Sequence, residues 1–314
     1  MGRKKHQEVA RLEYLEQKQP TPIRVLVLVL SLFEEPWKSW QRDGQDKTFL
    51  NDTPDGVRVL RFCGLAREKR LKFRLAILIK RTQHYLQKFG WSGSIPVLSS
   101  LQRYLSRIRV GDSTIARIKS SPGPCNFIQG PSSISTVDVI FTPIPSNPEL
   151  IGLSTIEAFG YALENYDFQY IFRTNSSSYV NLNKLMKLTE SLPKTGLYAG
   201  VEGRIFRTTT FASGAGYLIS KDVVEEICQS SGLWRHGLID DVALADFVST
   251  SLKVQIEQTP LPRSTIAKLK DAKALSRQEL QDHFHYRCKT DSIVETVKIM
   301  HQIHSLEKFH NEEN

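Results

Sequence analysis

Strands and helices alternate regularly along the second half of the chain, and this pattern restricts the possible fold more than any other feature. Short runs rich in Val, Ile, Phe and Tyr are separated by helical runs, and the connections are only a few residues long. Such connections indicate right-handed crossovers between parallel strands. We therefore predict an α/β fold with a mostly parallel, Rossmann-like sheet flanked by helices. The expected strands lie at 137–144, 168–174, 196–202 and, as a strand or turn, 211–220; the expected helices lie at 153–166, 181–192 and 221–229.

The apolar run from Ile23 to Ser31 is expected to be the first strand of this sheet. Its continuous Val and Leu side chains are typical of a parallel strand that is covered on both faces. The run continues only to Phe33, about half of the roughly 20 residues that a membrane-spanning helix needs. A second strand is expected at 57–64, and further helices near Ile239 and at 292–306. We expect a single domain at 23–305, with a flexible arm at 1–22 and a tail at 306–314.

The chain carries an excess of basic residues, 42 Lys and Arg against 33 Asp and Glu, which gives a formal charge of +9. This charge favours anionic partners such as nucleotide phosphates, nucleic acid or an acidic membrane surface. Two basic stretches, 67–81 and 103–119, are suited to peripheral contact with the inner face of a membrane or to nucleic-acid phosphates. Nucleic acid is the less favoured partner, because no helix-turn-helix, zinc-finger or RNA-recognition signature is present. The four cysteines show neither CxxC spacing nor the density of a disulfide scaffold, which favours a cytoplasmic location.

Three short motifs follow one another between Asp138 and Asp246. They are a helix and strand that end in NSSSYVN, the small-residue run FASGAGYLIS, and the acidic run IDDVALAD. In this order they resemble motifs of the β-1,3-galactosyltransferase and Fringe-like families of GT-A glycosyltransferases, over about a third of the chain. The resemblance implies a GT-A-like hexosyltransferase that binds a nucleotide sugar. The donor would be a UDP-sugar, the acceptor a hydroxyl group of a carbohydrate or glycolipid, and the transfer inverting.

The chain departs from these families at their acidic metal-binding triplet, which falls on Asn175, Ser176 and Ser177. Hard cations such as Mn²⁺ and Mg²⁺ prefer charged oxygen ligands, so the neutral triplet is a poor metal site. Its residues are expected to contact the donor through hydrogen bonds. Two interpretations remain: basic residues replace the metal, or the protein binds a sugar nucleotide without turning it over. Apart from the resemblance, the same residues are also typical of a polar turn that caps the following helix.

The acidic pair Asp240 and Asp241 is the best candidate for catalysis. An inverting transfer needs a carboxylate that takes the proton from the acceptor hydroxyl as it attacks the anomeric carbon. The resemblance assigns this role to Asp241, and Asp240 is the alternative. Paired aspartates are also common at the start of a helix, where they cap free amides and meet the positive end of the helix dipole.

The late segment HFHYRCK gathers basic groups that could contact a diphosphate. On a strand, His283, His285 and Arg287 would share one face. The resemblance makes His285 the late histidine of the family's metal site, but one histidine without carboxylates is a poor metal site. We therefore expect His285, Arg287 and Lys289, with Arg173 beside the triplet, to contact the donor diphosphate. A solvated basic strand is the alternative.

The small residues Ser213, Gly214 and Gly216 complete the predicted donor site. They would let a sugar approach the backbone closely, although the same residues also suit the close packing of a helix on a strand. All these assignments require that three segments far apart in the sequence line one site. Asn175, Asp241 and His285 are the test of that requirement.

Overall fold

A computed structural model describes residues 22–32, 35–64, 128–129, 137–142, 150–205, 209–235, 238–254 and 263–312. The basic stretches at 67–81 and 103–119 lie outside these residues, as does the expected arm apart from its last residue. Membrane or nucleic-acid contact through the basic stretches therefore stays a prediction.

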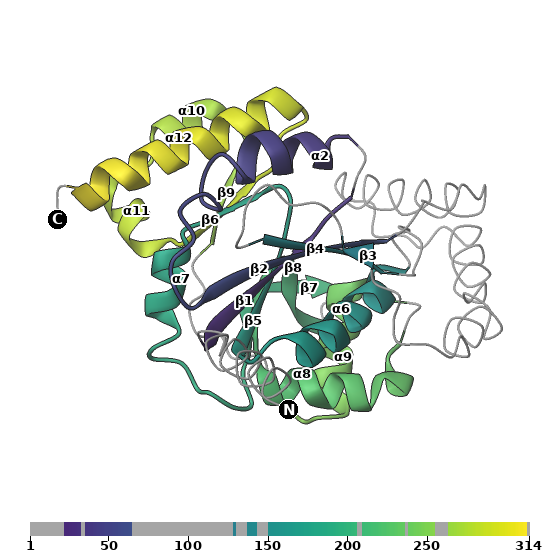
Figure 1. Cartoon of the computed structure of the whole chain (residues 1–314). Coiled ribbons are helices and arrows are strands. Elements are labelled where there is room, and N and C mark those ends of the chain that lie inside the picture. The colour runs from purple at the N-terminus through teal and green to yellow at the C-terminus, as the bar shows by residue number, and fades with distance from the viewer. Residues whose placement is uncertain are drawn as a thin grey trace, which may run out of the picture.

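The core of the protein is a seven-stranded sheet with the strand order β3-β4-β2-β1-β5-β8-β7 (Figure 1). Four neighbouring strands are parallel, as the alternating pattern predicted. They are β4 (Val137–Thr142), β2 (Val57–Gly64), β1 (Ile23–Leu30) and β5 (Phe168–Asn175). β3 (Ile128–Gln129) pairs with β4 in the antiparallel sense, and β8 (Thr209–Ser220) runs antiparallel to both β5 and β7 (Tyr198–Ile205). The prediction of an α/β fold with a mostly parallel sheet is confirmed.

The strand order reverses between β1 and β5. From β1 the chain adds β2 and β4 on one side, and then returns to place β5 on the other side. Ligands of open α/β sheets bind where the order reverses, at the carboxyl ends of the strands. In this sheet that place lies beside Leu30 and Asn175, which are partners at the ends of β1 and β5.

Two apolar layers cover the two faces of the sheet. One face packs against α6 (Ile151–Asn165), α8 (Lys221–Gln229) and α9 (Asp240–Thr250). The other face packs against α7 (Leu182–Leu188), α12 (Ile293–Glu312) and a second, three-stranded sheet. Figure 1 shows α6, α8 and α9 on one side of the strands and α12 on the other. The helix expected at 221–229 is confirmed, and the helix expected near Ile239 begins at Asp240.

The second sheet has the order β6-β10-β9. Its strands are β6 (Ser178–Val180), β10 (His285–Cys288) and β9 (Arg263–Ile266), and β10 is antiparallel to β6 and parallel to β9. β6 follows the end of β5 after a short turn, so the second sheet begins at the carboxyl edge of the first. The fold thereby brings the late HFHYRCK segment to the end of a central strand.

The last helix corrects the predicted domain boundary. α12 continues to Glu312, through most of the segment 306–314 that we expected to be a tail. Glu307 is 2% exposed, and its carboxylate accepts hydrogen bonds from the Asn181 amide at 2.9 Å and the Lys184 ammonium at 2.7 Å. A buried, paired carboxylate of this kind belongs to the folded domain. Small elements complete the fold: α2 (Trp37–Ser39), the π-helix η1 (Trp40–Gln45), η3 (Ser231–Leu233), α10 (Leu269–Lys273) and α11 (Arg277–Asp282).

Across the described parts of the chain, no helix combines the length and the apolar character that crossing a bilayer requires.

Candidate functional site

The turn after β5 carries the predicted neutral triplet, and its first residue organises it. The Asn175 side-chain oxygen accepts three hydrogen bonds, from the Ser177 backbone nitrogen at 3.1 Å, the Ser177 hydroxyl at 3.0 Å and the Ser178 hydroxyl at 3.1 Å. A backbone N–H only donates, so the acceptor must be the amide oxygen. This oxygen is neutral and already accepts three donors, which leaves it unsuited to coordinate a cation.

Ser176 links the ends of the two strands at which the sheet order reverses. It is fully buried, and its hydroxyl donates to the Leu30 carbonyl at 3.0 Å and accepts from the Gln41 amide at 3.2 Å. Gln45, from the same short helical segment as Gln41, donates to the Asn175 carbonyl at 3.1 Å. Ser176 is therefore a structural link between β1, β5 and η1 rather than the donor contact that we expected.

A divalent cation does not fit the described residues. The triplet supplies neutral, engaged oxygens. Within the described ranges, no group of three or more His, Cys, Asp and Glu side chains has the arrangement of a metal site. The GT-A resemblance implies a metal that holds the donor diphosphate, so another group would have to supply the positive charge in this protein.

Arg173, which is buried, and Asp240, which is partly buried, form an ion pair beside the turn. Arg173 is 3% exposed near the end of β5, and its guanidinium donates to the Asp240 carboxylate at 2.7 Å. It also donates to the Gly214 carbonyl of β8. One side chain thus ties the start of α9 to two strands of the large sheet. Arg173 was predicted to contact the donor and Asp240 was the alternative base, but here each is engaged by the other.

Asp241 lies next to this ion pair with its own set of partners. One carboxylate oxygen accepts from the Gly214 backbone nitrogen at 2.9 Å, and the other accepts from the Val242 backbone nitrogen at 3.0 Å. Burial, and next the negative charge of Asp240, raise the pKa of Asp241 above its usual value. The helix N-cap is Ile239, so Asp241 is not the capping residue of α9. A held carboxylate with a raised pKa is a better proton acceptor than an ordinary aspartate.

The glycines of β8 make room for protein side chains. A Cβ atom on Gly214 would lie 2.8 Å from the Arg173 guanidinium and 3.3 Å from the Asp241 carboxylate. A Cβ atom on Gly216 would lie 2.3 Å from the His285 ring. The packing alternative is therefore the better explanation of both glycines, and they shape the site by admitting Arg173, Asp241 and His285. Ser213 is half-buried, and its hydroxyl oxygen accepts from the Ala215 nitrogen at 3.4 Å.

Replacing Gly216 by Ala is expected to destabilise the fold by about 1–3 kcal/mol, because the new methyl group would collide with the buried His285 ring. Thermal denaturation measures the effect. Gly160→Ala is the matched control: Gly160 lies inside α6, and apart from the neighbouring backbone of that helix no atom comes within 4 Å of a Cβ placed there. Alanine has the higher helix propensity, so the control is expected to raise stability by up to ~1 kcal/mol. Equal behaviour of the two variants would contradict close packing at Gly216.

His285 lies at the start of β10 and is 2% exposed. Its ring packs against Phe172 of β5 with the ring centroids 5.5 Å apart, and its Nε2 atom has no hydrogen-bond partner among the described residues. Burial, with the charges of Arg263 and Arg287, lowers the pKa of His285 to about 3, so the ring is neutral at physiological pH. His283 was predicted to share the face of His285, but the strand begins only at His285. The His283 ring packs against Tyr286, a residue of the opposite face.

Arg263 is the site residue that the sequence analysis missed. It pairs with His285 across β9 and β10, and it lies on the same face as His285 and Arg287 because side chains alternate along strands. Both arginines carry buried guanidinium nitrogens without a hydrogen-bond partner in the described structure. Lys289 lies just beyond β10 and is exposed. The expected basic cluster is thus His285 and Arg287 with Arg263, and Lys289 stands at its margin.

The residues named by the three motifs meet at one edge of the sheet. Gly214 contacts both Arg173 and Asp241, and two residues further along β8, Gly216 contacts His285. The turn at Asn175 borders the same group, because Ser178 pairs with Arg287 across β6 and β10. β8 runs antiparallel to β5, so its residues 213–216, not its end at 220, lie at the carboxyl edge of β5.

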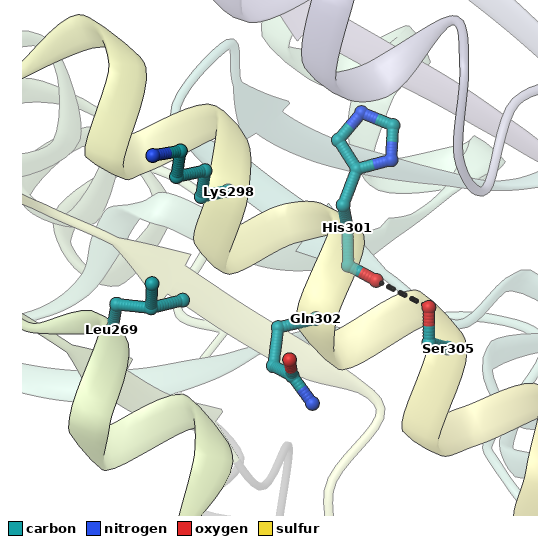
Figure 2. A pocket seen from close by; sticks show the side chains of 5 residues that line it. All are labelled: Leu269, Lys298, His301, Gln302 and Ser305. Carbon is teal, nitrogen blue, oxygen red and sulfur yellow. Dashed lines mark hydrogen bonds between the residues drawn. The ribbon is translucent and has the colours of Figure 1, made fainter.

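A separate surface pocket lies on α12 and is lined by Leu269, Lys298, His301, Gln302 and Ser305 (Figure 2). Figure 2 shows the His301 ring directed toward the N-terminal segment, where its Nε2 atom lies 2.8 Å from the Asp43 carbonyl oxygen. The lining has no carboxylate and shares no residue with the group around Asp241. It is not a candidate active site.

No protein-family model matches the chain, and no curated protein matches it. Among solved structures, the chain is similar to the crystal structure of mouse xyloside xylosyltransferase 1 in its apo form. The similarity covers 84% of this chain and 97% of that chain, at 7% sequence identity and a TM-score of 0.37. At this identity and TM-score, the similarity assigns no activity.

Proposed function

We propose that the protein transfers a sugar from a nucleoside-diphosphate sugar, such as a UDP-sugar, to a hydroxyl acceptor without a divalent metal. The acceptor class is a carbohydrate or glycolipid, and the anomeric configuration is inverted. One observation carries the proposal. A held carboxylate, Asp241, lies beside a group of unpartnered basic side chains at the edge where the sheet order reverses.

The chemistry divides between these groups. Asp241 takes the proton of the acceptor hydroxyl, and the hydroxyl oxygen then forms a bond to the anomeric carbon of the donor. The bond from that carbon to the diphosphate oxygen breaks, and the diphosphate leaves with the electron pair. Negative charge therefore develops on the leaving oxygen, which is where positively charged hydrogen-bond donors lower the barrier. Asp241 then releases its proton to solvent.

The Arg173–Asp240 ion pair supports this arrangement without touching the reacting atoms. It fixes the first residue of α9, and Asp241 is the next residue. Asp240 also contributes negative charge that raises the pKa of Asp241. We therefore assign Arg173 and Asp240 as positioning residues, and Asp241 as the catalytic base.

UDP is expected to raise the melting temperature of the protein to the same extent in EDTA and in Mn²⁺. A ligand that binds only the folded state stabilises it by about 2.7 kcal/mol at a concentration of 100 times its Kd. Differential scanning fluorimetry with UDP, and with ATP as the control nucleotide, makes the measurement. Stabilisation that appears only with Mn²⁺ would contradict metal-free binding. No stabilisation by UDP or by other nucleoside diphosphates would contradict the proposed function altogether.

Turnover distinguishes a transferase from a protein that binds without catalysis. Release of UDP from a panel of UDP-sugars, in the presence of EDTA and of mixed oligosaccharide acceptors, is the assay. Binding without release on any donor would favour the second interpretation of the neutral triplet.

A further inference from the structure

Arg263 and Arg287 project from adjacent strands of the small sheet with no carboxylate paired to either within the described residues. Two nitrogens of the Arg263 guanidinium, Nε and one terminal nitrogen, are buried without a hydrogen-bond partner, and so is the Nε atom of Arg287. His285, which is 2% exposed, lies on the same face, and its Nε2 atom also has no hydrogen-bond partner. Four buried polar atoms of three neighbouring residues thus lack partners.

This arrangement costs free energy in the absence of a ligand. A buried donor without an acceptor costs about 1–3 kcal/mol, and more when it is charged. Burial lowers the pKa of both arginines, and the positive charge of Arg287 lowers the pKa of Arg263 further. The surroundings of each guanidinium therefore disfavour its charged form. Elsewhere the described chain pairs each of its buried arginines with a carboxylate, Arg61 with Asp46 and Arg173 with Asp240, although the Nε atoms of these two arginines also lack a hydrogen-bond partner. The unpaired arginines are therefore the exception that an anionic ligand would explain.

The spacing of the two side chains suits a ligand with two neighbouring anionic centres. Arg263 is the partner of His285, and Arg287 lies two residues further along β10. Their backbone positions are thus separated by about 7 Å along the strands and about 5 Å across them. Guanidinium groups at the ends of two long side chains can converge from that distance on adjacent phosphates, and their planar forks match phosphate oxygens.

The position of the pair places such a ligand beside the base. Asp241 interacts electrostatically with Arg287 and raises its pKa, in opposition to burial, without forming an ion pair with it. Ser178 at the end of the neutral turn is the cross-strand partner of Arg287. An anion held by the two arginines would therefore lie between the turn at Asn175 and Asp241.

We propose that Arg263 and Arg287, with His285 as a neutral hydrogen-bond partner, form a diphosphate-binding site that supplies the positive charge a divalent metal would otherwise provide. The proposal rests on the proposed function for the identity of the nucleoside and sugar, but the site itself requires only a diphosphate.

Binding of inorganic pyrophosphate in EDTA tests the site directly. Isothermal titration calorimetry on the full chain is expected to show binding of pyrophosphate and of UDP, and weaker binding of single phosphate. Arg263→Gln and Arg287→Gln are each expected to weaken pyrophosphate and UDP binding by about 10- to 100-fold, because each removes charged hydrogen bonds to the ligand. Lys270→Gln is the matched control: it removes one positive charge from an exposed position on α10 and is expected to leave both affinities unchanged.

The stability of the ligand-free variants separates a binding site from a structural role. Removing one of two unpaired, partly buried charges is expected to raise the melting temperature of the ligand-free protein by about 2–4 °C while ligand affinity falls. A structural role for the arginines would lower the melting temperature instead. Arg263→Lys keeps the charge but loses the fork, and its affinity is expected to lie between those of the wild type and Arg263→Gln.

The outcomes separate this site from the proposed function. Pyrophosphate binding that depends on both arginines, without turnover of any UDP-sugar, would support the site and contradict catalysis. Turnover that persists with unchanged UDP affinity in the double variant Arg263→Gln, Arg287→Gln would contradict the site and leave the function standing. Absence of pyrophosphate binding by the wild-type protein would overturn the site.

Discussion

Asp241→Asn is expected to lower the rate of sugar transfer by about 10²- to 10⁴-fold while UDP affinity changes little, because the variant loses the proton acceptor and keeps the basic cluster. The amide has nearly the shape of the carboxylate. It can still accept one of the two backbone hydrogen bonds that Asp241 receives from Gly214 and Val242. Steady-state rates of UDP release, with and without acceptor, measure the effect.

The dependence of the transfer rate on pH tests the same role of Asp241. Asp241 must be ionised to take a proton, and burial raises its pKa above the usual value. The rate should therefore fall as the pH is lowered through that raised pKa, and the fall should begin at a higher pH than for an ordinary aspartate. Any residual activity of Asp241→Asn should lack this acid limb. His285 does not produce it, because its pKa is lowered to about 3 and its ring stays neutral throughout the range.

Asp246→Asn is the control for a general effect of charge on α9. Asp246 lies on the same helix and pairs with Arg235 at 3.2 Å, on the surface of the protein. Its substitution is expected to leave the rate and the pH profile unchanged. Full activity of Asp241→Asn, or an unchanged acid limb in that variant, would remove Asp241 from the role of base.

The strands could be predicted because the apolar residues of each strand indicate by themselves that the strand is buried. The Val and Leu run of β1 and the aromatic and Ile residues of β5 indicate covered strands without knowledge of the rest of the chain. The direction of β8 could not be predicted in the same way, since side chains alternate identically in parallel and antiparallel strands. The sequence therefore indicated which residues of β8 lie in the candidate site, but not the direction in which the strand runs.

The residues of the candidate site could be predicted where residues adjacent in the sequence form a recognisable motif. Asp240 and Asp241 stand together at a helix start, and the neutral triplet stands at a strand end. Arg263 has no such local signal: it is one arginine in a short RSTI strand, and only its pairing with β10, some twenty residues later, gives it a place beside Arg287. Ser176 was included as a donor contact although its hydrogen bonds are structural. Nothing in NSSS indicates which serine is buried by long-range contacts with β1 and η1.

Asp240→Leu is expected to destabilise the protein by about 3–5 kcal/mol, because it leaves the Arg173 charge buried without its partner. The corresponding fall in melting temperature is on the order of 10 °C. The double variant Arg173→Met, Asp240→Leu removes both charges and should regain most of the lost stability, because well-packed apolar side chains often replace a buried ion pair at little cost. Thermal denaturation of the two single variants and the double variant completes the cycle. A loss below ~1 kcal/mol in Asp240→Leu would contradict a buried, mutually dependent pair.

The double variant also separates positioning from donor binding. If the ion pair only fixes the start of α9, a double variant of near wild-type stability should bind UDP with unchanged affinity but transfer sugar more slowly, because Asp241 is held less accurately. If Arg173 instead contacts the donor diphosphate, as the sequence suggested, UDP affinity should fall with the loss of its charge. The observed pairing with Asp240 and the Gly214 carbonyl favours the first result, since these partners already engage the guanidinium. Arg263 and Arg287 differ from Arg173 in that neither forms an ion pair with a carboxylate of the described residues, so they are the better candidates to bind an anion.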